Sequence, residues 1–200
     1  PQIWITGTQG NSTGYEVAKW IAPLADQYNS DSGTSSTPIF RAAEAYLIYL
    51  EAYFERHQDL GGNCDKYWRA LRKRAGVNED YNVTIAATKL EKENDLAVWS
   101  RGMLIDKRLY NIRRERRCEF IAEGMRLDDL KRWRALDKMI NYQVEGMNLW
   151  DEMYKIYDDD QIKEGVVSQS GLSKYIRPLQ ISTTSVVYEN GYTFPKQHYL

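Results

Sequence analysis

The spacing of apolar residues predicts a helical hairpin in the first half of the chain. Thr37 and Pro38 form a typical helix start, because Thr is a common N-cap and Pro fits the first turn. From there to His57, apolar residues lie around most of the helical circumference, which predicts a helix buried on several sides. A second helix is predicted from Cys64, with apolar residues at steps of three and four until Gly76. We expect the two helices to pack antiparallel.

A second pair of helices is predicted after a less regular stretch. Residues 107–123 form one predicted helix, which Gly124 ends, and about 126–139 form the next. Between residues 84 and 103 the pattern is weaker, and the expected core residues there are Leu90, Leu96, Val98 and Trp99. Two hairpins joined in this way resemble tetratricopeptide stacking, although the repeat motif itself is absent.

Both ends of the chain are predicted to be irregular. Residues 1–37 are rich in Gly, Ser, Thr and Asn, and residues 140–200 carry Gly and Pro at loop-like intervals. The prediction is a mostly α fold in one domain: a loop-rich segment 1–37, helical hairpins over 38–139 and a wrapped extension over 140–200. The chain begins with Pro1 instead of Met, and no signal-peptide pattern follows, so we expect a fragment of a longer protein. Any targeting segment then lies upstream or was never present.

Composition excludes several classes of partner. The chain has 27 Lys and Arg against 28 Asp and Glu, so no net field attracts nucleic acid. The longest apolar run, Ala45 to Leu50, is far shorter than the roughly 20 residues that span a bilayer. His57 and His198 are the only histidines, and no pair of cysteines has metal-ligand spacing, so neither a metal site nor a cofactor is expected.

Two smaller predictions concern individual helix faces. On the helix that starts at Cys64, one face carries basic residues and is expected to be solvated: Lys66, Arg69, Arg72 and Lys73. Cys64 and Cys118 are expected to be buried free thiols on helices, which is favoured over a disulfide.

The most charged part of the sequence lies between residues 113 and 137. Arg116 falls on the same helical face as Leu109, Ile112, Phe120 and Glu123. Because a buried charge is tolerated only when it is paired, this face predicts a salt-bridge network. Its expected members are Arg116, Arg117, Glu119, Glu123, Asp128 and Asp129.

The alternative for these acidic residues is catalysis. Glu115, Glu119 or Glu123 would then serve as acid and base of a glycoside hydrolase, which needs two carboxylates facing a cleft. Every candidate is flanked by arginines, which keep a carboxylate ionised and make it a poor general acid. A structural role, and no enzymatic activity, is therefore the prediction.

Four segments resemble the SusD-like (RagB/SusD) family in order and spacing. The central one, residues 110–133, reads YNIRRERRCEFIAEGMRLDDLKRW and resembles the family's Arg- and Glu-rich helix with the Glu-Gly and Asp-Leu-x-Arg-Trp-like segments that follow it. Residues 40–52 read FRAAEAYLIYLEA, residues 67–77 read YWRALRKRAGV, and residues 174–178 read KYIRP; these are similar to further family segments.

The resemblance implies a largely helical protein with tetratricopeptide-like helix pairs. It also implies a lipidated N-terminal cysteine, upstream of this chain, that anchors the protein to the outer face of the outer membrane. There such proteins bind oligosaccharides, or sometimes peptides, and deliver them to a TonB-dependent SusC-like transporter. They are not enzymes and need no cofactor. A helical scaffold that docks a protein partner is the alternative function.

Aromatic residues in loops are the candidates for sugar binding, because a sugar ring stacks on an aromatic face. In the family the ligand surface uses loops that precede the Arg-Glu-Tyr-Leu helix. The resemblance therefore points to Trp4, Tyr15, Trp20 and Tyr28.

Overall fold

The computed structural model describes residues 38–136 and residues 15, 17, 19, 33, 146–148, 155 and 175. The chain divides into two compact units, residues 1–20 with 139–198 and residues 21–138 with 199–200. In the first unit, Asn148 and Tyr175 form an antiparallel bridge. All helices of the described residues belong to the second unit. The predicted segments 1–37 and 140–200 lie almost wholly outside the described residues and stay predictions.

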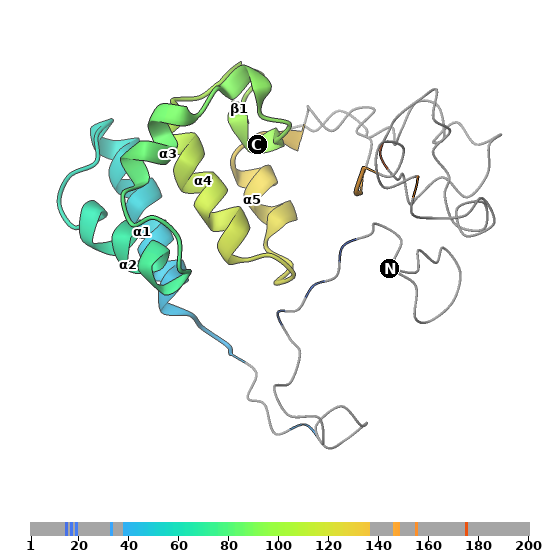
Figure 1. Cartoon of the computed structure of the whole chain (residues 1–200). Helices are drawn as coiled ribbons and strands as arrows, with labels where there is room; N and C mark the ends of the chain where they lie inside the picture. Colours follow the sequence, from blue (N-terminus) through green and yellow to red (C-terminus); the bar gives the residue numbers. More distant parts are fainter. Residues whose placement is uncertain are drawn as a thin grey trace. The chain divides into compact units, whose positions relative to one another are not determined.

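The second unit is mostly helical, as the sequence predicted (Figure 1). Its elements, in order, are α1 (Ala42–His57), α2 (Cys64–Arg74), α3 (Tyr81–Ala87), the 3-10 turns η2 (Leu90–Lys92) and η3 (Leu96–Val98), β1 (Trp99–Ser100), β2 (Met103–Leu104), α4 (Lys107–Glu119) and α5 (Arg126–Arg132). The two short strands form an antiparallel hairpin in which Trp99 is opposite Leu104. The weak pattern over residues 84–103 thus corresponds to short elements.

Helix α1 ends where predicted but begins later. Its N-cap residue, Arg41, has an extended backbone, so the predicted start at Pro38 is wrong. Phe40 is 90% exposed, and no core contact holds this segment in a helix. Along α1, a face that includes Leu47 and Leu50 is fully buried, whereas Ile48 on another face is 53% exposed.

Helices α1 and α2 form the predicted antiparallel hairpin. The rings of Tyr46 in α1 and Tyr67 in α2 stack with centroids 4.5 Å apart. One turn further along α1, the Tyr49 hydroxyl accepts a 3.2 Å hydrogen bond from the backbone N–H of Asn63. Trp68 of α2 is buried, as its spacing indicated, and its ring stacks on Tyr81 of α3.

Two of the predictions about individual faces are corrected. Arg72 is buried instead of solvated: its guanidinium donates to the Asn78 carbonyl at 2.5 Å and to Glu115 at 3.0 Å. These acceptors come from the loop after α2 and from α4, so the helical period of α2 alone does not reveal them. Both cysteines are free, but only Cys64 is buried, and Cys118 is exposed.

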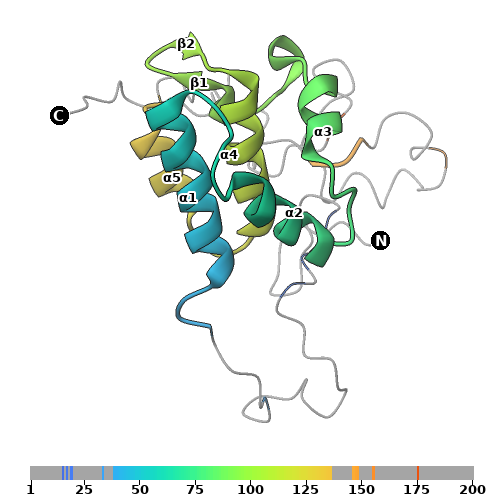
Figure 2. The same ribbon diagram turned by 90° about the vertical axis from the view of Figure 1, so that its left-hand side faces the viewer.

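Helix α4 lies at the centre of the unit and packs against α1, α3 and η3 (Figures 1 and 2). It ends at Glu119, four residues before the predicted end. The chain then reverses through Ala122 and Gly124, which both have positive φ, and enters α5. Among the described residues, no helix is long and apolar enough to cross a bilayer.

Candidate functional site

Helix α4 carries arginine side chains into the interior of the helical unit. Asp106 caps its start by accepting a 2.7 Å hydrogen bond from the backbone N–H of Arg108. Leu109, Ile112 and Phe120 are buried on the face that the spacing predicted, and Arg116 is buried among them. The local sequence therefore determines which α4 residues face inward, and neighbouring elements must supply the counter-charges.

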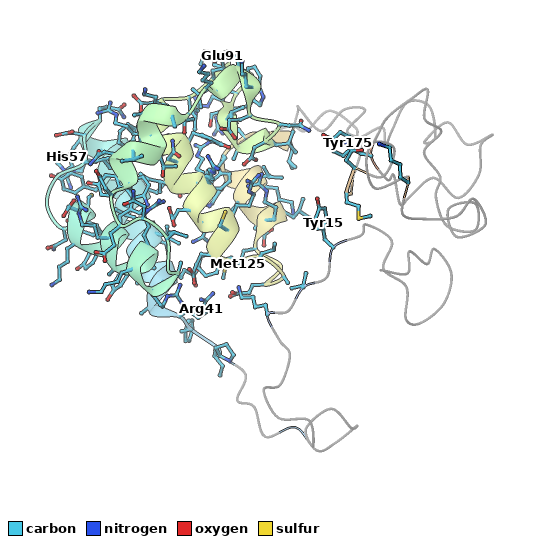
Figure 3. All side chains as sticks on the ribbon, in the orientation of Figure 1. Tyr15, Arg41, His57, Glu91, Met125 and Tyr175 are labelled. Atoms are coloured by element: carbon cyan, nitrogen blue, oxygen red, sulfur yellow. The ribbon has the colours of Figure 1, made fainter. Side chains whose placement is uncertain are left out.

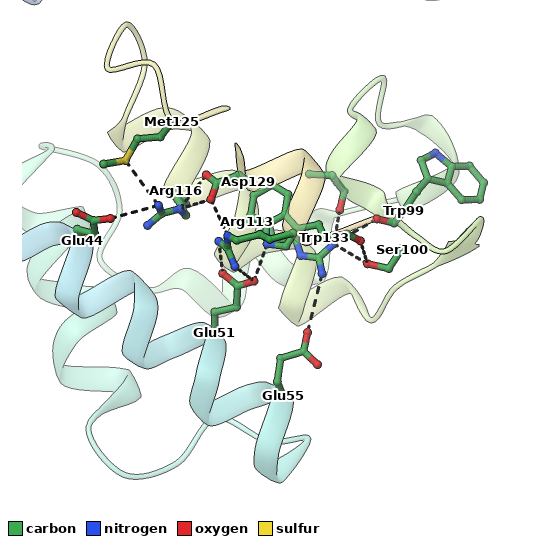
Figure 4. Close-up of polar contacts among 12 residues, drawn as sticks. Glu44, Glu51, Glu55, Trp99, Ser100, Arg113, Arg116, Met125, Asp129 and Trp133 are labelled. Atoms are coloured by element: carbon green, nitrogen blue, oxygen red, sulfur yellow. Dashed lines mark hydrogen bonds and ion pairs between the residues drawn. The ribbon is translucent and has the colours of Figure 1, made fainter. Parts of the chain in front are cut away.

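Arg116 has its counter-charge on α5. Its Nε lies 2.9 and 2.8 Å from the two carboxylate oxygens of Asp129. Its Nη2 lies 3.6 Å from Glu44 of α1 (Figure 4). Its guanidinium also lies over the Phe120 ring, 4.9 Å from the ring centroid. Arg116 thus connects three helices through one planar group, a geometry that arginine allows and lysine does not.

A second buried carboxylate, Glu51 of α1, holds the end of α5. It accepts two hydrogen bonds of 2.8 Å from Arg132 and one of 2.6 Å from the indole N–H of Trp133. Arg132 also donates to Asp129 at 2.8 Å. We name these five residues, Glu51, Arg116, Asp129, Arg132 and Trp133, the interhelical network.

Arg113 lies beside the interhelical network but has weaker partners. It is only 3% exposed, and its Nη1 donates to the Ser100 hydroxyl at 3.0 Å and to two backbone carbonyls at 3.3 Å. Its nearest carboxylate in α1, Glu55, is 3.9 Å away. Burial lowers the pKa of Arg113 to about 10, which remains high enough for a full positive charge at neutral pH.

The structure brings together only part of the predicted salt-bridge set. Arg116 and Asp129 pair with each other, whereas Arg117 pairs with Asp95 at 2.8 Å. Asp128 is on the surface, 3.5 Å from Lys131.

The two remaining predicted members, Glu119 and Glu123, pair with Arg41 at the start of α1, and Glu119 also pairs with Arg74 of α2. Figure 3 shows Arg41 and Met125 near the same end of the helical unit. Sequence reasoning missed Arg41 and Glu51 as partners. A signal for Glu51 was present, since it lies four residues after Leu47 on the apolar face of α1.

Glu115 and Glu119 of α4, and Glu123 in the turn that follows, do not have the geometry of catalytic carboxylates. Glu115 accepts hydrogen bonds from the Trp68 indole at 2.9 Å and from Arg72 at 3.0 Å. Glu119 and Glu123 are paired with arginine as described above. Carboxylates that pair with arginines of neighbouring helices in this way have a structural role.

The predicted ligand-binding aromatics are only partly within the described residues. Tyr15 is 68% exposed, which suits a contact residue. Trp4, Trp20 and Tyr28 lie outside the described residues. Within the part of the chain that the structure describes, no three His, Cys, Asp or Glu side chains form a group that could hold a metal ion.

Comparison with known proteins gives the family. The model of the SusD family matches residues 6–191, almost the whole chain. The chain belongs to the SusD family. No curated protein and no solved structure matches it. Membership of the SusD family indicates binding of a glycan or another nutrient at the cell surface, and SusD-family proteins are generally non-catalytic. The resemblance noted in the sequence is thus confirmed.

Proposed function

We propose that this SusD-family protein binds an oligosaccharide or another nutrient at the outer-membrane surface and delivers it unchanged to a TonB-dependent SusC-like transporter. A lipid anchor upstream of the described helices holds it there. The family match over residues 6–191 carries this proposal.

The charges of the helical unit support a binding role over a catalytic one. Glu115 and Glu119 of α4, and Glu123 in the turn that follows, each pair with arginine, and these pairs connect α4 and its C-terminal turn to α1 and α2. Carboxylates engaged in ion pairs between helices stabilise the packing of the unit and are not placed as a catalytic pair.

The ligand contacts are proposed for the aromatic residues that precede α1, namely Trp4, Tyr15, Trp20 and Tyr28. The exposure of Tyr15 supports this choice, because an exposed ring offers its face to a sugar. Alanine at Trp4 or Trp20 is expected to weaken glycan binding about tenfold, equivalent to about 1.4 kcal/mol for one lost stacking surface.

The test is calorimetric titration of the full chain with a panel of neutral and acidic oligosaccharides, followed by chromatography of the sugar. Phe40→Ala is the matched control, since Phe40 is also an exposed aromatic residue but lies outside the loop-rich segment. Saturable binding without a new sugar product supports the proposal, and turnover overturns it. If no glycan binds while the transporter still co-purifies with the protein, the helical docking scaffold becomes the better assignment.

A further inference from the structure

A cavity of about 610 Å³ opens between α1, the β1–β2 hairpin and the end of α5. The cavity is lined by residues of four elements, including Ile48, Glu51 and Glu55 of α1, Arg101 of the hairpin, Arg113 of α4 and Arg132 of α5. Its volume falls within the range of about 300–1,000 Å³ that is typical of small-molecule sites. None of the residues assigned to the SusD-family function lines it.

The charges around this cavity are unequally satisfied. Glu51 is neutralised by the two hydrogen bonds from Arg132. Arg113, in contrast, is buried with neutral oxygens around its Nη1, and its Nε has no hydrogen-bond partner among the described residues. Figure 4 shows Glu55 reaching from α1 toward Arg113, but the two side chains are 3.9 Å apart. Four arginines (Arg101, Arg113, Arg132 and Arg134) and two glutamates line the cavity, so its wall has an excess of positive charge and favours an anion.

We propose that this cavity binds the carboxylate of an acidic sugar, such as a uronic acid unit of an oligosaccharide. Arg113 at the inner wall presents a planar guanidinium, which suits a planar carboxylate, and Arg101 adds a second positive charge at the exposed rim. Glu55 is 54% exposed and can accept hydrogen bonds from sugar hydroxyls.

A single negative charge fits the cavity better than a phosphate. The carboxylate of Glu55, which is half-exposed on this wall, would repel a dianion more strongly than a single negative charge. The choice of a sugar as the carrier of the carboxylate rests on the proposed function. The choice of an anion rests on the arginines that line the cavity.

The test is titration of the full chain, labelled with ¹⁵N at tryptophan, with digalacturonate. Trp133 lines the cavity and donates its indole N–H to Glu51, so its indole resonance reports on this site. The comparison ligands are a neutral disaccharide of the same size, acetate and diglycine. We expect a saturable shift of the Trp133 resonance with digalacturonate only.

Two exposed arginines provide matched variants. Arg101→Ala removes a charge from the rim and is expected to weaken digalacturonate binding at least fivefold, by analogy with the loss of one charge-assisted hydrogen bond. The backbone at Arg101 has a φ of 52°, which alanine and arginine tolerate equally, so the fold is kept. Arg56→Ala removes the same charge from α1 outside the cavity and is expected to leave binding unchanged.

The outcomes separate this proposal from the proposed function. If digalacturonate leaves the Trp133 resonance in place, or if the neutral disaccharide, acetate or diglycine moves it equally, the cavity is not an acidic-sugar site. An equal loss of binding in Arg56→Ala and Arg101→Ala also overturns the proposal. In a further outcome, neutral glycans release heat on binding while no ligand shifts the Trp133 resonance. That result overturns the cavity assignment but leaves glycan binding by the SusD-family protein intact.

Discussion

Glu51 is expected to be the most sensitive single carboxylate of the helical unit. Its side chain accepts three hydrogen bonds, two from Arg132 and one from Trp133. Glu51→Ala removes all three acceptor contacts at once. The buried indole N–H of Trp133 then lacks a partner, and this alone costs about 1–3 kcal/mol.

The loss of the Arg132 pair adds to this cost. Breaking a buried ion pair costs about 3–5 kcal/mol, but the Arg132 side chain is 44% exposed and water replaces part of the interaction. We therefore expect Glu51→Ala to lower the free energy of unfolding by about 3 kcal/mol in total. Glu51→Gln keeps an acceptor for the indole and is expected to cost about half as much.

The measurement is urea unfolding of the full chain, followed by tryptophan fluorescence and circular dichroism. Glu55→Ala is the matched control on the same helix, because Glu55 is 54% exposed and 3.9 Å from its arginine. The control is expected to change the free energy of unfolding by less than about 0.5 kcal/mol. If Glu51→Ala is no more destabilising than Glu55→Ala, then the interhelical network does not hold α5 and the reasoning fails.

Three further predictions concern single residues. Asp106→Ala removes the N-cap of α4 and is expected to lower the free energy of unfolding by about 1 kcal/mol. Hydrogen bonds from Arg108 lower the pKa of Asp106 below its ordinary 3.8, so the stability difference between wild type and variant should shrink as the pH falls below that value. Urea unfolding at several pH values measures this difference. The exposed Cys118 should react rapidly with a thiol reagent. Cys64 should react about 10³-fold more slowly, because it is buried and burial raises the pKa of its thiol. Equal reaction rates would contradict the fold. Tyr110→Phe removes a buried hydroxyl that donates a 2.8 Å hydrogen bond and should cost about 1 kcal/mol by thermal or urea unfolding, and an unchanged stability would refute that role.

Much of the helical unit was predictable because its helices satisfy local rules. The apolar steps after Cys64 correctly predicted α2, and the position of Arg116 among Leu109 and Ile112 correctly predicted a buried arginine. The start of α1 was predicted wrongly, since Pro38 meets the rules for a helix start but has no core to pack against.

The partners of the buried charges were much less accessible to sequence reasoning. The predicted network drew all its members from residues 116–129, because charges close in sequence are the only ones whose distance a helical period gives. Glu51 meets Arg132 across 81 positions of the chain, and Arg41 meets Glu119 across 78. The candidate ligand aromatics depend on the family resemblance, and Tyr15 alone lies within the described residues.

The sequence by itself determined the helical class, the hairpin of α1 and α2, the inward face of α4 and membership of the SusD family, since these follow from spacing and motifs along the chain. The tertiary structure decided which carboxylate neutralises each arginine. It also placed Arg113, whose Nε has no hydrogen-bond partner among the described residues, in the wall of a cavity. Pairing of this kind depends on how separate helices approach one another, and the order of residues along one helix does not contain that information.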